Sequence, residues 1–302
     1  MDEPLPSGLT ARFQAMACGC ELQLDGAERP VLEAAARAAV AEVRRIERTF
    51  SRYRDDSIVS RINAAAGQPG FVPVDAETAS LLDFAAQLHA QSAGLFDITS
   101  GVLRRAWDFR AARLPDAAAL QALLTCVGWQ HVQCQDAGVR LSRPGMELDF
   151  GGFGKEYAAD RAAGVLLAAG VQRGFINLGG DIRVLGPRAD GSPWRLGIQH
   201  PRHAGATVAT LELAQGALAT SGDYERYFEH EGRRYCHILD PRTGWPVQHW
   251  QSVSVTAPLC IAAGALTTIA MLMGPAALPF LQAQGAAYLA VDAAGQVQLP
   301  AS

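Results

Sequence analysis

The sequence has 302 residues, 49% of them hydrophobic and 19% charged, so it is long and apolar enough to bury a large core. Its formal net charge of −4 and the scatter of its 26 basic residues argue against a nucleic-acid partner. We expect no transmembrane segment. None of the six cysteines has metal-ligand spacing, and we interpret all six as reduced thiols.

The first half of the chain is predicted to alternate strands with helices. Alternating side chains predict one strand over residues 12–24, with Met16 in its middle. Apolar residues at helical spacing predict a long helix over 28–50. Helix-start residues and periodicity add further segments, which are helices beginning near 57, over 74–93 and over 115–127, and two or three short strands between 131 and 150.

The stretch 148–186 contains two glycine-rich turns, each with a carboxylate beside it. A short strand, residues 148–150, leads into Gly151-Gly152 and then a helix. A second strand, 175–178, leads into Gly179-Gly180-Asp181. Such turns can present backbone N–H groups to an anion, and they can equally be plain tight turns.

The second half is richer in strands. We expect strands over 194–198, 206–213, 216–221 and 252–256, a hairpin with strands 224–228 and 235–239, helices over 260–273 and 276–284, and a closing hairpin. Because strands and helices are interleaved irregularly, with no linker or repeat, the sequence predicts an α+β fold in one unit.

Four common catalytic motifs are absent. Gly154-Lys155 is followed by Glu156 rather than by Ser or Thr, which excludes a P-loop. No G-x-G-x-x-G opens a helix after a strand, and neither G-x-S-x-G nor H-E-x-x-H occurs. These absences exclude the common nucleotide-binding and hydrolase folds.

Seven short motifs, in order from about Phe13 to Gly274, resemble the ApbE-type FAD:protein FMN transferases. They are residues 13–16, 50–63 (FSRY, DS and SRIN), 94–97 (GLFD), 148–160, 177–181 (NLGGD), 219–224 (ATSGDY) and 237–244 (HILDPRTG). The resemblance implies a single α+β domain over 1–302 that binds FAD in a cleft, with 1–11 as a flexible tail. It also implies magnesium-dependent transfer of FMN from FAD onto a Ser or Thr hydroxyl of a target flavoprotein, with release of AMP.

The resemblance assigns roles to individual residues. Those implied to line the flavin and adenine cleft are Met16, Tyr53, Phe96, Asp97, Asp149, Lys155 and Ile238. Aromatic rings suit stacking, a carboxylate suits ribose or adenine, and Lys155 suits the pyrophosphate. His237 is the implied catalytic base, because an unperturbed imidazole titrates near neutral pH. Plain core packing is the alternative for Tyr53 and Phe96, and a structural hydrogen bond is the alternative for His237.

The sequence departs from the family at the implied Mg²⁺ site. The Thr268 hydroxyl and the Gly152 carbonyl remain as ligands by resemblance, and Thr268 also belongs to the catalytic set. The expected Asp, one helical turn before Thr268, is Gly264. Because magnesium prefers oxygen ligands that include carboxylates, we expect a weakened site, or one rebuilt with Asp181 or Asp240. On this basis Gly264→Asp should raise metal-dependent FAD turnover by at least an order of magnitude.

Several functions therefore remain open at the level of sequence. The main hypothesis is an FAD:protein FMN transferase whose partners are FAD and an acceptor flavoprotein. The alternatives are an FAD-binding carrier or assembly protein with little activity, an FAD pyrophosphatase that yields FMN and AMP, and a flavin-free structural relative. The start of the sequence lacks a signal peptide, which predicts a cytoplasmic protein, or a periplasmic or membrane-anchored one if an export signal was trimmed away.

Overall fold

The computed structural model describes residues 8–135 and 137–300. Its centre is an eight-stranded sheet, in which every neighbouring pair is antiparallel, in the order β1-β2-β6-β7-β10-β13-β14-β15. These strands are β1 Leu9–Ala15, β2 Cys18–Asp25, β6 Arg173–Leu178, β7 Asp181–Gly186, β10 Gly216–Gly222, β13 Trp250–Ala257, β14 Ala287–Asp292 and β15 Val297–Gln298.

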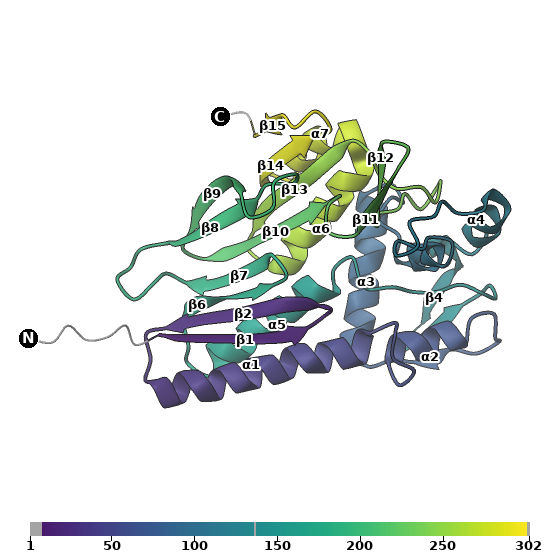
Figure 1. Ribbon diagram of the computed structural model, residues 1–302. Coiled ribbons are helices and arrows are strands. Elements are labelled where there is room, and N and C mark those ends of the chain that lie inside the picture. Colours follow the sequence, from purple (N-terminus) through teal and green to yellow (C-terminus); the bar gives the residue numbers. More distant parts are fainter. Residues whose placement is uncertain (1–7, 136, 301–302) are drawn as a thin grey trace, which may run out of the picture.

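Helices cover one face of this sheet, and a hairpin covers the other (Figure 1). The helices are α1 Arg29–Phe50, α5 Gly154–Ala168, α6 Cys260–Met273 and α7 Ala277–Ala283, with the 3₁₀ turn η3 Gly274–Ala276 between the last two. The hairpin consists of β8 Trp194–Gln199 and β9 Thr207–Leu213. Side chains of α1, α5 and α6 enter the main core, whereas the hairpin packs through a separate cluster around Trp194.

A second group of elements lies beyond one end of the large sheet (Figure 1). It contains α2 Ile58–Ala64, α3 Ala76–Gln91, η1 Ile98–Arg105, α4 Ala117–Leu124, η2 Trp129–His131, the small sheet β3 Val72–Pro73, β5 Gly138–Leu141 and β4 Val132–Gln135, and the hairpin β11 Tyr227–His230 with β12 Arg233–Cys236. Local sequence signals begin these helices, since Ser57, Asp75 and Asp116 accept capping hydrogen bonds at α2, α3 and α4.

Most predicted elements are confirmed, including the α+β class, but four segments need correction. Residues 12–24 form a hairpin rather than one strand, because Met16 and Ala17 turn the chain with φ of 55° and 58°. Residues 148–150 pair with no strand, and the strand predicted over 235–239 ends at Cys236. Of the predicted tail 1–11, residues 1–7 lie outside the described residues, whereas β1 already begins at Leu9.

The expectation about membrane-spanning stretches needs one qualification. Cys260–Ala283 is, by length and composition alone, apolar enough to cross a membrane, with a mean hydropathy of 1.7 in its most apolar 18-residue window. The chain breaks its α-helical course there at η3, and half of the most apolar window is buried. Cys260, Ala265 and Ile269 of α6 belong to the main core, so the structure uses this stretch as a core helix.

Candidate functional site

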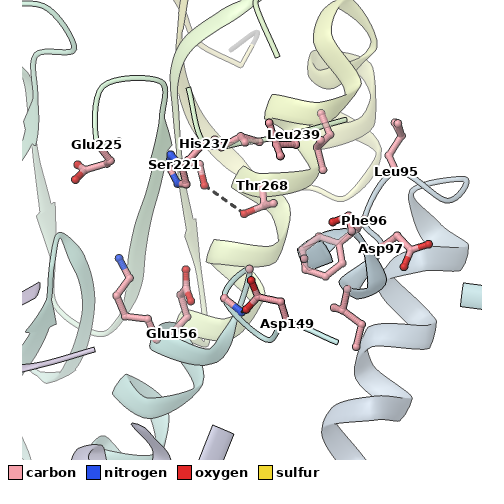
Figure 2. Close-up of a pocket in the computed structure, with 18 of the residues that line it drawn as sticks. Leu95, Phe96, Asp97, Asp149, Glu156, Ser221, Glu225, His237, Leu239 and Thr268 are labelled. Atoms are coloured by element: carbon pink, nitrogen blue, oxygen red, sulfur yellow. Dashed lines mark hydrogen bonds between the residues drawn. The ribbon is translucent and has the colours of Figure 1, made fainter. Parts of the chain in front are cut away.

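A cleft opens where the N-terminal end of α5 meets the sheet, η1 and α6. The residues that line it come from six segments, namely 95–104, 149–156, Asp181, 220–225, 237–239 and the α6 residues Thr268 and Leu272. The close-up in Figure 2 shows this cleft. Because its lining is drawn from residues far apart in the sequence, the cleft exists only in the folded chain.

The ammonium group of Lys155 is held in the cleft by an ion pair. The Lys155 ammonium, in the first turn of α5, lies 2.7 Å from the Asp181 carboxylate, whose side chain is almost fully buried. Asp181 also accepts a hydrogen bond from the Thr220 backbone N–H at 3.1 Å. Burial opposes the charge of Lys155, but Asp181 and Glu156 keep its pKa above the ordinary value. The ammonium therefore stays protonated beside the N-terminal end of a helix, where anions are favoured.

Glu156 is a buried carboxyl group without a complete set of partners. The residue is 7% exposed, and its Oε2 atom has no hydrogen-bond partner among the described residues. Burial raises the pKa of Glu156 to about 8, and the nearby Asp181 carboxylate adds to this rise. Its neighbour on α6 is Gly264, where an added Cβ would lie 2.5 Å from the Glu156 Cγ atom.

Three hydroxyl groups form a connected set between β10 and α6. Ser221 Oγ on β10 lies 2.9 Å from Thr267 Oγ1 and 3.3 Å from Thr268 Oγ1 on α6. Thr267 donates to the Gly264 carbonyl at 2.9 Å. Figure 2 shows Ser221, Thr268 and Glu156 around the same part of the cleft. This part of the site thus offers oxygen atoms from one carboxyl group and several hydroxyls.

Two arginines fix Asp149 at the rim of the cleft. Arg52 Nη1 lies 3.1 Å and Arg104 Nη1 lies 3.5 Å from Asp149 Oδ2. Burial alone would raise the pKa of Asp149, but the two guanidinium groups hold it below its ordinary value. The Asp149 Oδ1 atom accepts from the Gly151 N–H at 2.8 Å, which shapes the turn before α5.

His237 follows β12 and contributes an imidazole to the cleft. Its backbone N–H donates to the Arg226 carbonyl at 2.9 Å, whereas its Nδ1 atom is buried and has no partner among the described residues. Burial, with the positive charges of Arg104 and Arg226, lowers the pKa of His237 to about 4. The imidazole is therefore neutral at physiological pH and can accept a proton.

Eight of the ten residues assigned from sequence line this cleft, namely Phe96, Asp97, Asp149, Gly152, Lys155, His237, Ile238 and Thr268. The cleft lining does not include Met16 or Tyr53. Met16 sits in the β1–β2 turn, where its N–H donates to Glu47 at 2.6 Å. Tyr53 is 74% exposed, and its hydroxyl accepts from Arg104 at 3.4 Å.

The side chains of two lining residues make contacts that stabilise the fold. The Phe96 ring is 4% exposed and stacks on Phe153 with centroids 6.2 Å apart, which fits the core-packing alternative. One oxygen of Asp97 accepts from Thr99, and the other accepts from the Trp129 N–H at 3.0 Å. The side chain of Asp97 therefore holds η1 and a neighbouring loop together.

Glu156 and Arg104 are site residues that the sequence alone did not predict. Glu156 served there only to exclude a P-loop, although an acidic residue next to Lys155 in the first turn of a helix is a usable signal. Arg104 is one of two adjacent arginines with no motif of its own, and only the fold brings it to Asp149.

The oxygen-rich part of the cleft suits a hard divalent cation. Magnesium binds through one or two carboxylates together with hydroxyls, carbonyls and phosphate oxygens of a substrate. Among the described residues, no group of three or more His, Cys, Asp or Glu side chains is arranged to hold a metal ion. The donor set fits the cation nevertheless, because a buried carboxyl oxygen without a partner belongs to the same cleft lining as the Thr268 hydroxyl.

The fold and this cleft define an α+β protein with an anion-binding, hydroxyl-rich cleft, and comparison with known proteins gives its family. The ApbE family model matches residues 16–290, so the chain belongs to the ApbE family. A relative from Klebsiella pneumoniae named FAD:protein FMN transferase is 31% identical over 260 residues, which are 83% of this chain and 74% of that one. A relative of the same name from Treponema pallidum is 34% identical over 271 residues, which are 82% of this chain and 74% of that one.

Solved structures of the family share the fold. The ApbE protein of Thermotoga maritima superposes with a TM-score of 0.89 at 31% identity, covering 97% of this chain and 96% of that one. The flavin transferase ApbE from Vibrio cholerae superposes with a TM-score of 0.87 at 25% identity, covering 99% and 98%. The resemblance inferred from seven short motifs is thereby confirmed over nearly the whole chain.

Proposed function

We propose that this protein is an FAD:protein FMN transferase, as its relatives are named. The observation that carries the proposal is the cleft itself. It combines an ammonium at a helix N-terminus, Lys155, with a neutral imidazole, His237, and the hydroxyl-rich face of α6. The first group suits a pyrophosphate and the second suits proton transfer from an alcohol.

His237 and Lys155 act at different points of the proposed reaction. A Ser or Thr hydroxyl of the acceptor flavoprotein attacks the phosphorus of the FMN half of FAD. The new phosphoester bond forms as the pyrophosphate bond breaks, and AMP leaves. His237 takes the hydroxyl proton during the attack, since its low pKa makes it a weak base that acts only as the bond forms.

Lys155 neutralises the pyrophosphate and the charge that builds on the departing AMP oxygen. Asp181 holds the ammonium in place through the 2.7 Å ion pair. A magnesium ion, when bound, would polarise the phosphate oxygens, and the Thr268 hydroxyl and the Gly152 carbonyl are the ligands that the family resemblance implies.

The test is to incubate the protein with FAD in magnesium or in a chelator, with and without an acceptor flavoprotein domain. Release of AMP and covalent flavin fluorescence on the acceptor are measured together. Transferase activity predicts both signals, and their loss in the chelator would show that the reaction depends on magnesium. AMP without labelled acceptor would mean a pyrophosphatase, and tight FAD binding without AMP would mean a carrier.

The variant His237→Ala separates chemistry from binding. It removes the proton acceptor, so acceptor labelling should slow by about 10²–10⁴-fold while FAD affinity stays within a few-fold of the parent. Loss of FAD binding in a folded His237→Ala protein would instead assign His237 a structural role.

A further inference from the structure

The position of Glu156 suits a metal ligand, because its carboxyl group is buried with one oxygen atom left unpaired among the described residues. Five buried side-chain polar atoms lack a hydrogen-bond partner among the described residues, and Glu156 Oε2 is one of them. A buried carboxyl oxygen without a partner costs free energy, so it persists where another group satisfies it. The cleft beside it is open to such a group.

The contact between α5 and α6 places this carboxyl. Asp160, one turn after Glu156, accepts from the N–H groups of Cys260 and Ile261 at 2.9 Å each. That cap fixes the start of α6 beside the middle of α5. Glu156 lies one turn before Asp160 in α5, and Gly264 lies one turn after Cys260 in α6. These two residues are neighbours, so the two helices run antiparallel here.

Gly264 provides the space that Glu156 fills. An added Cβ would lie 2.7 Å from Glu156 Oε1 and 2.8 Å from its Cδ, so no side chain fits at 264 while Glu156 keeps its position. This space can therefore hold a carboxylate from α5 or one from α6, but not both. The Asp expected at position 264 of α6 is absent, and the carboxyl group of Glu156 on α5 lies in its place.

The oxygen atoms around Glu156 form a cation-binding set. Ser221 and Thr268, 3.3 Å apart, supply hydroxyls, and the Gly152 carbonyl belongs to the turn before α5. Glu156 and Asp181 line the same cleft as one ammonium, Lys155. When both carboxyl groups are ionised, a bound cation balances the excess negative charge.

We propose that Glu156 supplies the anionic ligand of a divalent-cation site in this cleft, in place of the side chain that Gly264 lacks. The site binds a hard cation of the Mg²⁺ or Mn²⁺ kind through Glu156, the Thr268 hydroxyl and phosphate oxygens of FAD. The inference rests on the proposed function for the identity of the phosphate ligand. It also removes the reason for an FAD carrier, because the carboxylate is displaced rather than lost.

The test measures metal binding directly. Mn²⁺ is titrated into the full chain, with and without FAD, and free Mn²⁺ is followed by its electron paramagnetic resonance signal. Glu156→Gln should weaken Mn²⁺ binding at least about tenfold, since it removes the anionic ligand and keeps the shape. The double variant Glu156→Gly/Gly264→Asp, which moves the carboxylate from α5 to α6, should restore binding to within a few-fold.

Glu225→Gln is the matched control. It neutralises another, exposed carboxylate at the cleft and should leave Mn²⁺ affinity unchanged. The inference is overturned if Glu156→Gln binds Mn²⁺ as the parent does, if the folded double variant stays as weak as Glu156→Gln, or if the parent binds no Mn²⁺ with FAD present.

AMP release and acceptor labelling, measured after an acceptor flavoprotein domain is added to the same samples, keep the two proposals apart. Acceptor labelling that needs no metal would retain the transferase and overturn the cation site. Mn²⁺ binding that depends on Glu156, without any AMP release, would support the cation site and overturn the transferase.

Discussion

The Asp160 carboxylate on α5 caps the helix α6 through the backbone N–H of Cys260, at 2.9 Å. Its second oxygen accepts from Ile261, and Arg183 Nε lies 3.2 Å from Oδ1. A side chain that caps a different helix joins the two helices at a fixed register. The cleft depends on that register, because it decides which residue of α5 lies beside Gly264.

Replacing Asp160 should destabilise the protein more than an ordinary cap does. Asp160→Ala removes two hydrogen bonds to N–H groups and takes the carboxylate from the partly buried Arg183, so we expect a loss of about 3 kcal/mol. Asp116→Ala removes an exposed cap of α4 and should cost only about 1 kcal/mol. Urea unfolding measures both, and equal losses would show that Asp160 is no more than a cap.

The contact at Gly264 reverses the expectation drawn from sequence for this position. Gly264→Ala, like Gly264→Asp, drives a Cβ into the Glu156 side chain and should cost about 1–3 kcal/mol. Metal-dependent turnover of the single variant Gly264→Asp should then fall, rather than rise, relative to the parent. In a Glu156→Ala background the clash is gone, and Gly264→Ala should become neutral or stabilising.

The control for this cycle is Gly164, which lies in α5, the helix that carries Glu156. An added Cβ there meets nothing within 4 Å, so Gly164→Ala should stabilise by up to about 1 kcal/mol in either background. If Gly264→Ala is as well tolerated as Gly164→Ala while Glu156 is present, the two side chains do not share one space.

Lys155 is the only lysine in the sequence, and the fold places it in the cleft. Lys155→Met should weaken FAD binding about 10–100-fold, as expected for charge-assisted hydrogen bonds to phosphate, and should reduce its salt dependence. Arg110→Met removes an exposed charge away from the cleft and should change neither quantity. Titration of flavin fluorescence at two salt concentrations checks this, and unchanged affinity in Lys155→Met would remove the pyrophosphate role.

Local signals in the sequence predicted the elements well, whereas contacts between distant elements were not predictable. The bounds of α6 follow from its apolar run, and the starts of α2 and α3 follow from capping residues. The turn at Met16 was missed because neither Met nor Ala normally marks a position with positive φ. Glu156 was missed because its meaning lies in its distance from Gly264, which no local pattern encodes.

His237 should make stability fall in acid. Its folded-state pKa of about 4 lies below the ordinary 6.5, so the unfolded chain takes up a proton at a pH where the folded chain does not. This contribution is fully present above pH 6.5 and is lost as the pH falls through 4, by about 3 kcal/mol. His237→Gln should flatten the stability curve in that window, and an unchanged difference between parent and variant from pH 7 to pH 4 would contradict the lowered pKa.

Cys18 should be the most reactive thiol toward alkylation at neutral pH. Its Sγ lies 3.9 Å from that of Cys20, and this hydrogen bond, with the charge of Lys155, lowers the pKa of Cys18 to about 7 against the opposing effect of burial. Burial raises the pKa of the more exposed Cys134, so Cys134 carries less thiolate at pH 7. Mass spectrometry of iodoacetamide-treated protein should therefore find Cys18 labelled first, with a midpoint near pH 7.

The Cys20→Ala variant tests the cause of that reactivity. Without the neighbouring thiol, the midpoint for Cys18 should move up toward the ordinary value of about 8.5. Cys236, whose pKa burial raises to about 11, should stay unlabelled throughout and reports that the protein remains folded. A midpoint for Cys18 that does not move in Cys20→Ala would assign the lowered pKa to Lys155 instead, and a Lys155→Met variant would then raise it.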